Sequence, residues 1–207
     1  METKITDFWN HFLAIQTDLI KSKCEDNLTL HSELFDTLST KAIKIHPKLN
    51  VFALYIMRED VKAKLVFPTK GNNILGALVF KIVNRAPYSD FWEFQIGVTP
   101  YNGSIIQLCS TISFFDLPTT VFQIYFAVQK IYKSSNKLHL LIYMEINRRY
   151  SKSDLQSAMD GIFMLFLGDV LYFNHISRFK IVRRKYSKIR FLPLEELKNF
   201  IHYKNLN

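Results

Sequence analysis

With 207 residues, 48% of them hydrophobic and 14% aromatic, the chain is long and apolar enough to bury a core without disulfides or a structural metal. This composition excludes a disordered chain, and two cysteines, Cys24 and Cys109, are too few for a disulfide-rich secreted framework. The formal net charge of +9 is uneven, because residues 171–207 carry nine Lys or Arg against two Glu.

The N-terminus lacks the features of a secretory signal. Glu2 and Asp7 lie where a signal peptide carries positive charge, and no uninterrupted apolar run follows them. The most apolar stretch, 162–173, is broken by Gly168-Asp169 and is too short to span a bilayer. Together with the few, distant cysteines, these features predict a cytoplasmic protein in a reducing compartment, without membrane association.

Hydrophobic periodicity and helix-breaking residues define the elements expected in the first half of the chain. One apolar side chain per turn from Phe8 to Leu19 predicts a helix, and Pro47 must end the next helix near His46. Gly71-Asn72-Asn73 breaks the chain and can cap a third helix. The expected elements are helices over 7–20 and up to 46, strands over 51–57 and 61–67 joined by a charged turn at 58–60, a helix after 73, and a strand over 91–98.

The second half is expected to hold more strands. The strand over 138–147 is apolar on both faces, which predicts a central position in the sheet. Ser153-x-x-Gln156 is a capping-box pattern that predicts a fourth helix, and Gly168 is expected to end it. Pro193 favours the start of a short last helix. The other expected strands cover 105–115, 121–131, 170–173 and 176–182.

These elements predict an α+β fold in a single domain spanning residues 1–207, with a mostly antiparallel sheet and helices packed largely on one face. No linker rich in Gly, Pro or Ser divides the chain. The order strand-strand-helix-strand fits residues 51–98 and again 121–182. This repeated order suggests a weak internal duplication, although the residues themselves hardly match.

Motifs that carry enzyme chemistry are absent from the sequence. The six histidines form no HxH or HExxH pattern, and the chain has no Walker loop, no dinucleotide-binding fingerprint and no Gly-x-Ser-x-Gly. We therefore expect no metal, no cofactor, no catalytic residue and a non-enzymatic protein. Asp169, between apolar segments, is the acid most expected to be buried and to accept backbone N–H groups in a turn.

The strongest local anomaly is the segment Arg178–Arg190, which holds seven basic residues in thirteen and no acid. In a strand, Arg178 and Lys180 would face water while Phe179 and Ile181 face the core. Two interpretations are open: a basic row that attracts nucleic acid or another anionic partner, or a charged edge that prevents edge-to-edge aggregation. The candidate anion- or partner-binding residues are Arg178, Lys180, Arg183, Arg184, Lys185, Lys188 and Arg190.

Five short segments carry a resemblance: Phe8-Trp9-Asn10-His11-Phe12, Leu49-Asn50-Val51-Phe52, Gly71-Asn72, Ala86-Pro87 followed by Trp92, and Leu167-Gly168-Asp169. Together they resemble a family of uncharacterised bacterial proteins with an aromatic W-x-x-F start and a late Leu-Gly-acid motif, in which Glu is commoner than Asp. The resemblance implies a bacterial, cytoplasmic, single-domain protein and assigns no catalytic residue. The basic C-terminal segment departs from it.

The absence of chemical motifs favours a small non-enzymatic protein that acts by binding another protein, as an accessory or immunity-type protein does. The alternative is nucleic-acid binding through residues 178–190. A hydrolase or transferase is a third interpretation, because catalytic groups need not be neighbours in the sequence.

Overall fold

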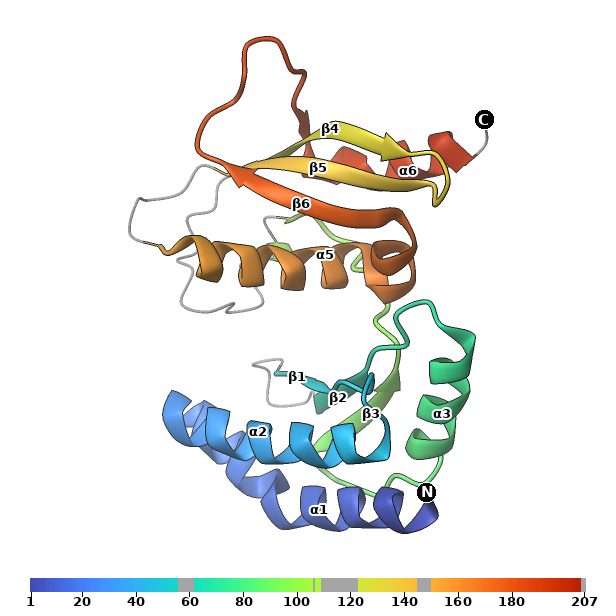
Figure 1. Ribbon diagram of the computed structural model, residues 1–207. Helices are drawn as coiled ribbons and strands as arrows, with labels where there is room; N and C mark the ends of the chain where they lie inside the picture. The colour runs from blue at the N-terminus through green and yellow to red at the C-terminus, as the bar shows by residue number, and fades with distance from the viewer. Residues whose placement is uncertain (56–61, 106, 109–122, 145–149, 206–207) are drawn as a thin grey trace. The chain divides into compact units, whose positions relative to one another are not determined.

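The computed structural model describes residues 1–55, 62–105, 107–108, 123–144 and 150–205. The chain divides into two compact units, Met1–Gly97 and Val98–Asn207 (Figure 1). Both units contain helices and strands, so the predicted α+β class is confirmed. That the two units form one domain stays a prediction.

Among its described residues, the first unit contains the helices α1 (Glu2–Cys24), α2 (Leu28–Ile45) and α3 (Asn73–Val83). Asn27 caps α2 and Asn72 caps α3, because each side-chain oxygen accepts backbone N–H groups of the first helical turn. His46 is extended because Pro47 follows it, so α2 ends where predicted. The three helices expected in this half of the chain are therefore confirmed.

The first unit also holds a three-stranded sheet in the order β1-β2-β3. Its strands are β1 (Phe52–Leu54), β2 (Ala63–Phe67) and β3 (Trp92–Ile96). β1 and β2 are antiparallel, whereas β3 runs parallel to β2 because α3 carries the chain back before β3 begins. The predicted turn at 58–60 lies outside the described residues.

The core of this unit lies between one face of the sheet and the helices α1, α2 and α3. Alternate residues of β2, Ala63, Leu65 and Phe67, belong to it together with Trp9 and Trp92. The two tryptophans are 4% and 2% exposed, and their indole N–H groups donate to backbone carbonyls 3.0 and 3.3 Å away. Both tryptophans therefore belong to the core of the first unit.

The second unit is built around a sheet in the order β6-β5-β4-β7. Its elements are β4 (Ile124–Tyr132), β5 (Lys137–Met144), α5 (Lys152–His175), β6 (Ile176–Val182), β7 (Leu192–Pro193), the 3-10 helix η1 (Leu194–Glu196) and α6 (Leu197–Asn205). β4 is antiparallel to β5 and β7, and β6 is parallel to β5. β5, apolar on both faces, is central as predicted.

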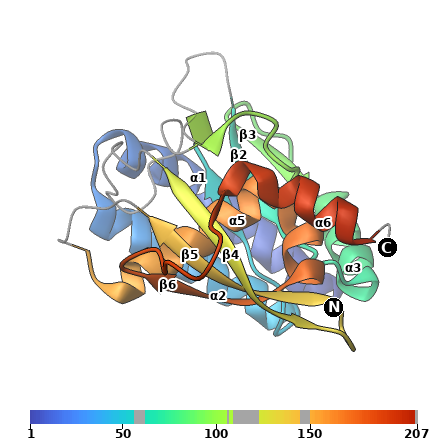
Figure 2. The ribbon, with the colours of Figure 1, turned by 90° about the horizontal axis from the view of Figure 1, so that it is seen from above.

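Both sheets are mixed, so the predicted mostly antiparallel arrangement is wrong. In each sheet a helix connects the second strand to the third, and this crossover makes the third strand parallel to its neighbour. The helices share one face of the second sheet: Phe179 of β6 packs on Phe163 of α5, and Phe126 of β4 packs on Phe200 of α6. Figure 2 shows α6 running beside β4.

The predicted repeat of element order is present. β1, β2, α3 and β3 follow one another in the first unit, and β4, β5, α5 and β6 in the second. The strand pairing repeats as well, with an antiparallel pair followed by a parallel third strand. That the repeat arose by duplication stays a prediction.

Two local predictions in the second unit are wrong. The hydroxyl of Ser151 caps α5, rather than that of Ser153 two residues later. The described residues of the predicted strand 105–115 are helical: Ile105, Gln107 and Leu108. The rest of that segment lies outside the described residues.

Gly168 divides α5 into two helical segments. Its φ of 77° and ψ of 157° are outside the helical region, so the first helical segment of α5 ends at Gly168, as predicted. A second helical segment follows directly, so the predicted strand over 170–173 is wrong. The interruption turns the helix so that Tyr172 stacks on Phe163, with ring centres 5.6 Å apart, and donates a hydrogen bond to Asp160. After Gly168, Tyr172 therefore packs on the preceding part of α5, a contact that the sequence pattern does not reveal.

α5 is the one helix among the described residues that is long and apolar enough to cross a membrane. Half of its most apolar window is buried inside the protein. Core helices of globular proteins pass the same test of length and composition. The predicted cytoplasmic location stays a prediction.

Candidate nucleic-acid interface

The face of the second sheet opposite α5 and α6 carries a group of cationic residues. Lys130 of β4, His139 of β5 and Arg178 of β6 form one row across three strands, because His139 is the strand partner of the other two. Lys180 follows Arg178 on the same side of β6, and Tyr132 follows Lys130 on β4. We call Lys130, Tyr132, His139, Arg178 and Lys180 the basic face.

The pKa of His139 reflects the charge density of this face. Burial lowers the pKa of His139 below the usual range of imidazole, and repulsion from Arg178, Lys180 and Lys130 lowers it further. Those three cationic side chains are exposed. Three positive charges from the two flanking strands therefore act on one imidazole, at a point where a bound anion would relieve their repulsion.

Tyr132 is the aromatic member of the basic face. Its side chain is half-buried, and the Lys130 Nζ and the Arg178 Cζ lie 4.9 and 6.0 Å from the centre of its ring. These distances are within the range of cation–π attraction. Tyr132 is thus an aromatic ring with cations from two different strands lying over it.

Residues 183–190 form a loop, called the basic loop below, between β6 and β7 at opposite edges of the sheet. Figure 2, seen from above, shows the chain after β6 passing over β5 and β4 toward α6. Every residue of the loop is exposed. The Lys185 Nζ lies 3.1 Å from the ring centre of Tyr125 and 5.3 Å from that of Tyr143, which are strand partners on β4 and β5. Lys185 of the loop therefore brings further positive charge to the same face of the sheet.

All seven predicted candidate residues are described and exposed. Arg178 and Lys180 lie on β6 with Phe179 buried between them, as the alternation predicts. The other five belong to the basic loop: Arg183, Arg184, Lys185, Lys188 and Arg190.

Sequence reasoning missed the residues that complete the basic face, Lys130, Tyr132 and His139. The alternation of residues in the expected strands 121–131 and 138–147 was the available signal. It could not show that β5 pairs with β4 on one side and with β6 on the other, because the pattern within one strand does not specify its register with a distant strand.

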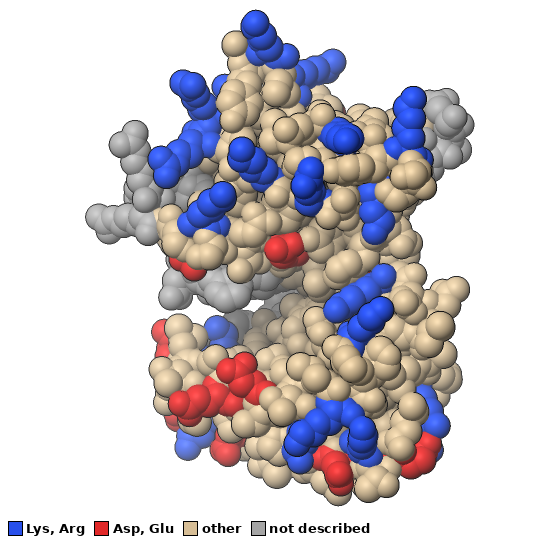
Figure 3. Space-filling view, in the orientation of Figure 1, with Lys and Arg blue, Asp and Glu red and all other residues tan. Residues whose placement is uncertain are grey.

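The positive charge of the chain is concentrated in the second unit. Val98–Asn207 contains 15 of the 27 Lys and Arg but seven of the 18 Asp and Glu, so it carries +8 of the formal +9. Every ion pair found between described residues lies in Met1–Gly97. In Figure 3 the Lys and Arg side chains of the second unit gather over its strands and the loop above them.

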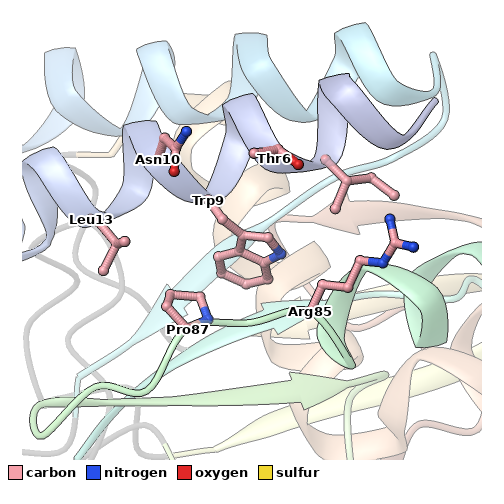
Figure 4. Close-up of a pocket in the computed structure, with 7 residues that line it drawn as sticks. Thr6, Trp9, Asn10, Leu13, Arg85 and Pro87 are labelled. Atoms are coloured by element: carbon pink, nitrogen blue, oxygen red, sulfur yellow. The ribbon is translucent and has the colours of Figure 1, made fainter.

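A pocket of about 200 Å³ in the first unit offers no comparable chemistry. Figure 4 shows Trp9 of α1 pointing toward the segment of Arg85 and Pro87. Arg85 is the charged group of the lining, and it forms an ion pair with Glu2. A cation held by a carboxylate beside a structural tryptophan provides no acid–base pair for catalysis.

Asp169 has a structural role. It is 1% exposed, and its Oδ1 accepts the backbone N–H of Val98 at 3.0 Å. It accepts a backbone N–H as predicted, but from a segment 71 residues away rather than from its own turn. Cys24 is exposed and free, whereas Cys109 lies outside the described residues. In the described part of the chain, no three His, Cys, Asp or Glu residues are placed to hold a metal ion.

No protein-family model, curated protein or solved structure matches this chain. The resemblance to an uncharacterised bacterial family therefore stays a prediction.

Proposed function

We propose that the basic face and the basic loop together bind the phosphate backbone of a nucleic acid. The observation that carries this proposal is the position of five basic residues in an exposed loop beyond β6, with no ion pair to a described carboxylate. A charged edge strand would account for Arg178 and Lys180, because β6 is an edge of the sheet. It does not account for the five in the loop, which forms no strand.

The electrostatics of the unit support a polymer rather than a small anion as the ligand. Like charges that are held together repel one another, and a polyanion relieves this repulsion along its whole length. The cations extend from Lys130 across Arg178 and Lys180 to the basic loop, so one extended ligand can contact many of them. Each phosphate neutralised also releases counterions, which contributes favourably to the binding free energy.

A protein partner is the second candidate, favoured by one observation. A groove of about 610 Å³ lies between β4, the loop residues Lys188–Arg190 and α6, and Phe126, Ile131 and Phe200 give it an apolar lining. Such a groove fits apolar side chains of a partner, and Lys188, Arg190 and Glu196 are the charged residues of its lining. The predicted accessory or immunity-type role would use this groove, and it stays a prediction.

The decisive test removes loop charge without touching the core. In the triple variant Arg183→Gln, Arg184→Gln, Lys185→Gln, we expect binding of a fluorescent 20-nucleotide RNA or DNA, measured by anisotropy at about 50 mM salt, to weaken at least tenfold. The free energy of unfolding should hardly change, since exposed charges contribute little to folding.

A matched control removes the same charge from the other unit. Lys4, Lys44 and Lys48 are exposed residues of Met1–Gly97, and their joint replacement by Gln should leave the affinity within about twofold. Equal losses in both triple variants would show that net charge alone attracts the probe and would contradict a defined interface. Absence of binding by the wild type would contradict the proposal altogether.

A further inference from the structure

We propose that the ligand of the basic face is single-stranded and that one of its bases stacks on Tyr132. This inference rests on the proposed function and adds the class of nucleic acid. It follows from the position of Tyr132 on the open face of the sheet, next to the row of Lys130, His139 and Arg178.

The geometry around Tyr132 suits a nucleotide. Its ring is half-buried, so its orientation is held by the sheet while part of its surface reaches solvent. Lys130 Nζ and Arg178 Cζ, 4.9 and 6.0 Å from the ring centre, come from two different strands. A base that stacks on the ring takes the place of a cation–π contact, and the displaced cation stays beside the phosphates on either side of the base. Stacking and phosphate contacts would then act on the same nucleotide.

A duplex cannot use this arrangement. The bases of a duplex are stacked on one another, so an aromatic side chain meets their edges or the phosphates, not their faces. A single strand exposes the face of every base, and each base has a π-surface, so the stacking is tolerant of sequence. The cations alone would serve both kinds of nucleic acid, and the tyrosine favours the single strand.

The first unit contains a matched control for Tyr132. Tyr88 is 83% exposed, and the Lys62 Nζ lies 5.4 Å from its ring centre. It is therefore a lysine–tyrosine contact in the unit whose net charge is close to zero. If exposed tyrosine beside lysine were sufficient for binding, Tyr88→Ala would weaken binding as Tyr132→Ala does.

The experiment compares Tyr132→Ala, Tyr132→Phe and Tyr88→Ala with the wild type, using three probes: a 12-nucleotide oligo(U), a 12-base-pair RNA duplex and heparin. We expect Tyr132→Ala to weaken oligo(U) binding by roughly 5- to 150-fold, the range of one stacked base. Tyr132→Phe keeps the ring and should bind within about threefold of the wild type, as should Tyr88→Ala. Heparin has no bases, so its affinity should not depend on Tyr132.

A second readout makes the result independent of small changes in stability. With 2-aminopurine in the oligonucleotide, fluorescence should be quenched on binding to the wild type and to Tyr132→Phe, and less so on binding to Tyr132→Ala. Oligo(U) binding that is unchanged in Tyr132→Ala, with the duplex bound equally well, would overturn the inference and leave the proposed function standing. Failure of all three probes to bind would overturn both.

Discussion

The two units share the order strand-strand-helix-strand and the same strand pairing, but the sheet faces opposite their helices differ. In the first unit, Lys64 of β2 lies opposite Glu93 of β3, and their side chains form an ion pair at 3.4 Å. In the second unit, the corresponding row pairs His139 with Arg178, and Lys180 follows. The same arrangement of strands thus carries a neutral row in one unit and a cationic row in the other.

The aromatic residues show the same contrast. In the first unit Trp9, Phe12 and Phe94 pack edge-to-face inside the core. In the second unit Tyr125 and Tyr132 lie on the face of the sheet opposite the helices, with lysine side chains near their rings. Fold alone does not distinguish these roles, so function must be argued from the residues at matching positions.

The largest expected effect tests the structural role of the first unit's aromatic core. Trp92→Ala should lower the free energy of unfolding by about 3–5 kcal/mol, because the indole is 2% exposed and its removal leaves a cavity. Phe91, its neighbour in the chain, is 59% exposed, so Phe91→Ala should cost less than about 1 kcal/mol. Urea unfolding measures both, and equal losses would contradict the assignment of Trp92 to the core.

A smaller effect tests the interruption of α5 in the second unit. Gly168→Ala should cost about 1–3 kcal/mol, because the residue has positive φ and a Cβ there would lie 2.7 Å from the Val98 carbonyl oxygen. At Gly76, inside α3, a Cβ would lie 3.9 Å from the Thr69 side chain, an ordinary van der Waals contact, so Gly76→Ala should stabilise the protein by about 0.4–1 kcal/mol. Thermal or urea unfolding should show opposite signs, and the same sign in both would contradict this account of Gly168.

The smallest expected effect concerns the charge density of the basic face. Arg178→Gln removes one of the cations that repel protonated His139, so the pKa of His139 should rise toward its usual value. A bound phosphate should also raise the pKa of His139, since it favours the imidazolium. Complex formation then takes up protons, and affinity increases as the pH falls through the pKa of His139. NMR titration of His139 measures both shifts, and an unchanged pKa in the variant would contradict the proximity of Arg178.

Sequence reasoning located most helices and strands, because their apolar periodicity and their caps are local. It also identified the seven basic residues and the water-facing side of β6. It was wrong about residues 170–173, which are helical rather than a strand, because Tyr172 and Phe163 meet only after the chain has turned at Gly168. The mixed sheets and the basic face were missed for a related reason. Lys130, His139 and Arg178 become neighbours only through strand pairing, which a pattern within one strand cannot specify.

The salt dependence of binding tests the central claim most directly. If the basic face and the basic loop together contact five to seven phosphates of a single strand, the logarithm of the binding constant should fall with the logarithm of salt concentration with a slope of about −3.5 to −5. In the triple variant Arg183→Gln, Arg184→Gln, Lys185→Gln, the slope should be shallower by about two to three units. Tight binding with a slope near zero, or a slope that the triple variant leaves unchanged, would contradict phosphate recognition by this surface.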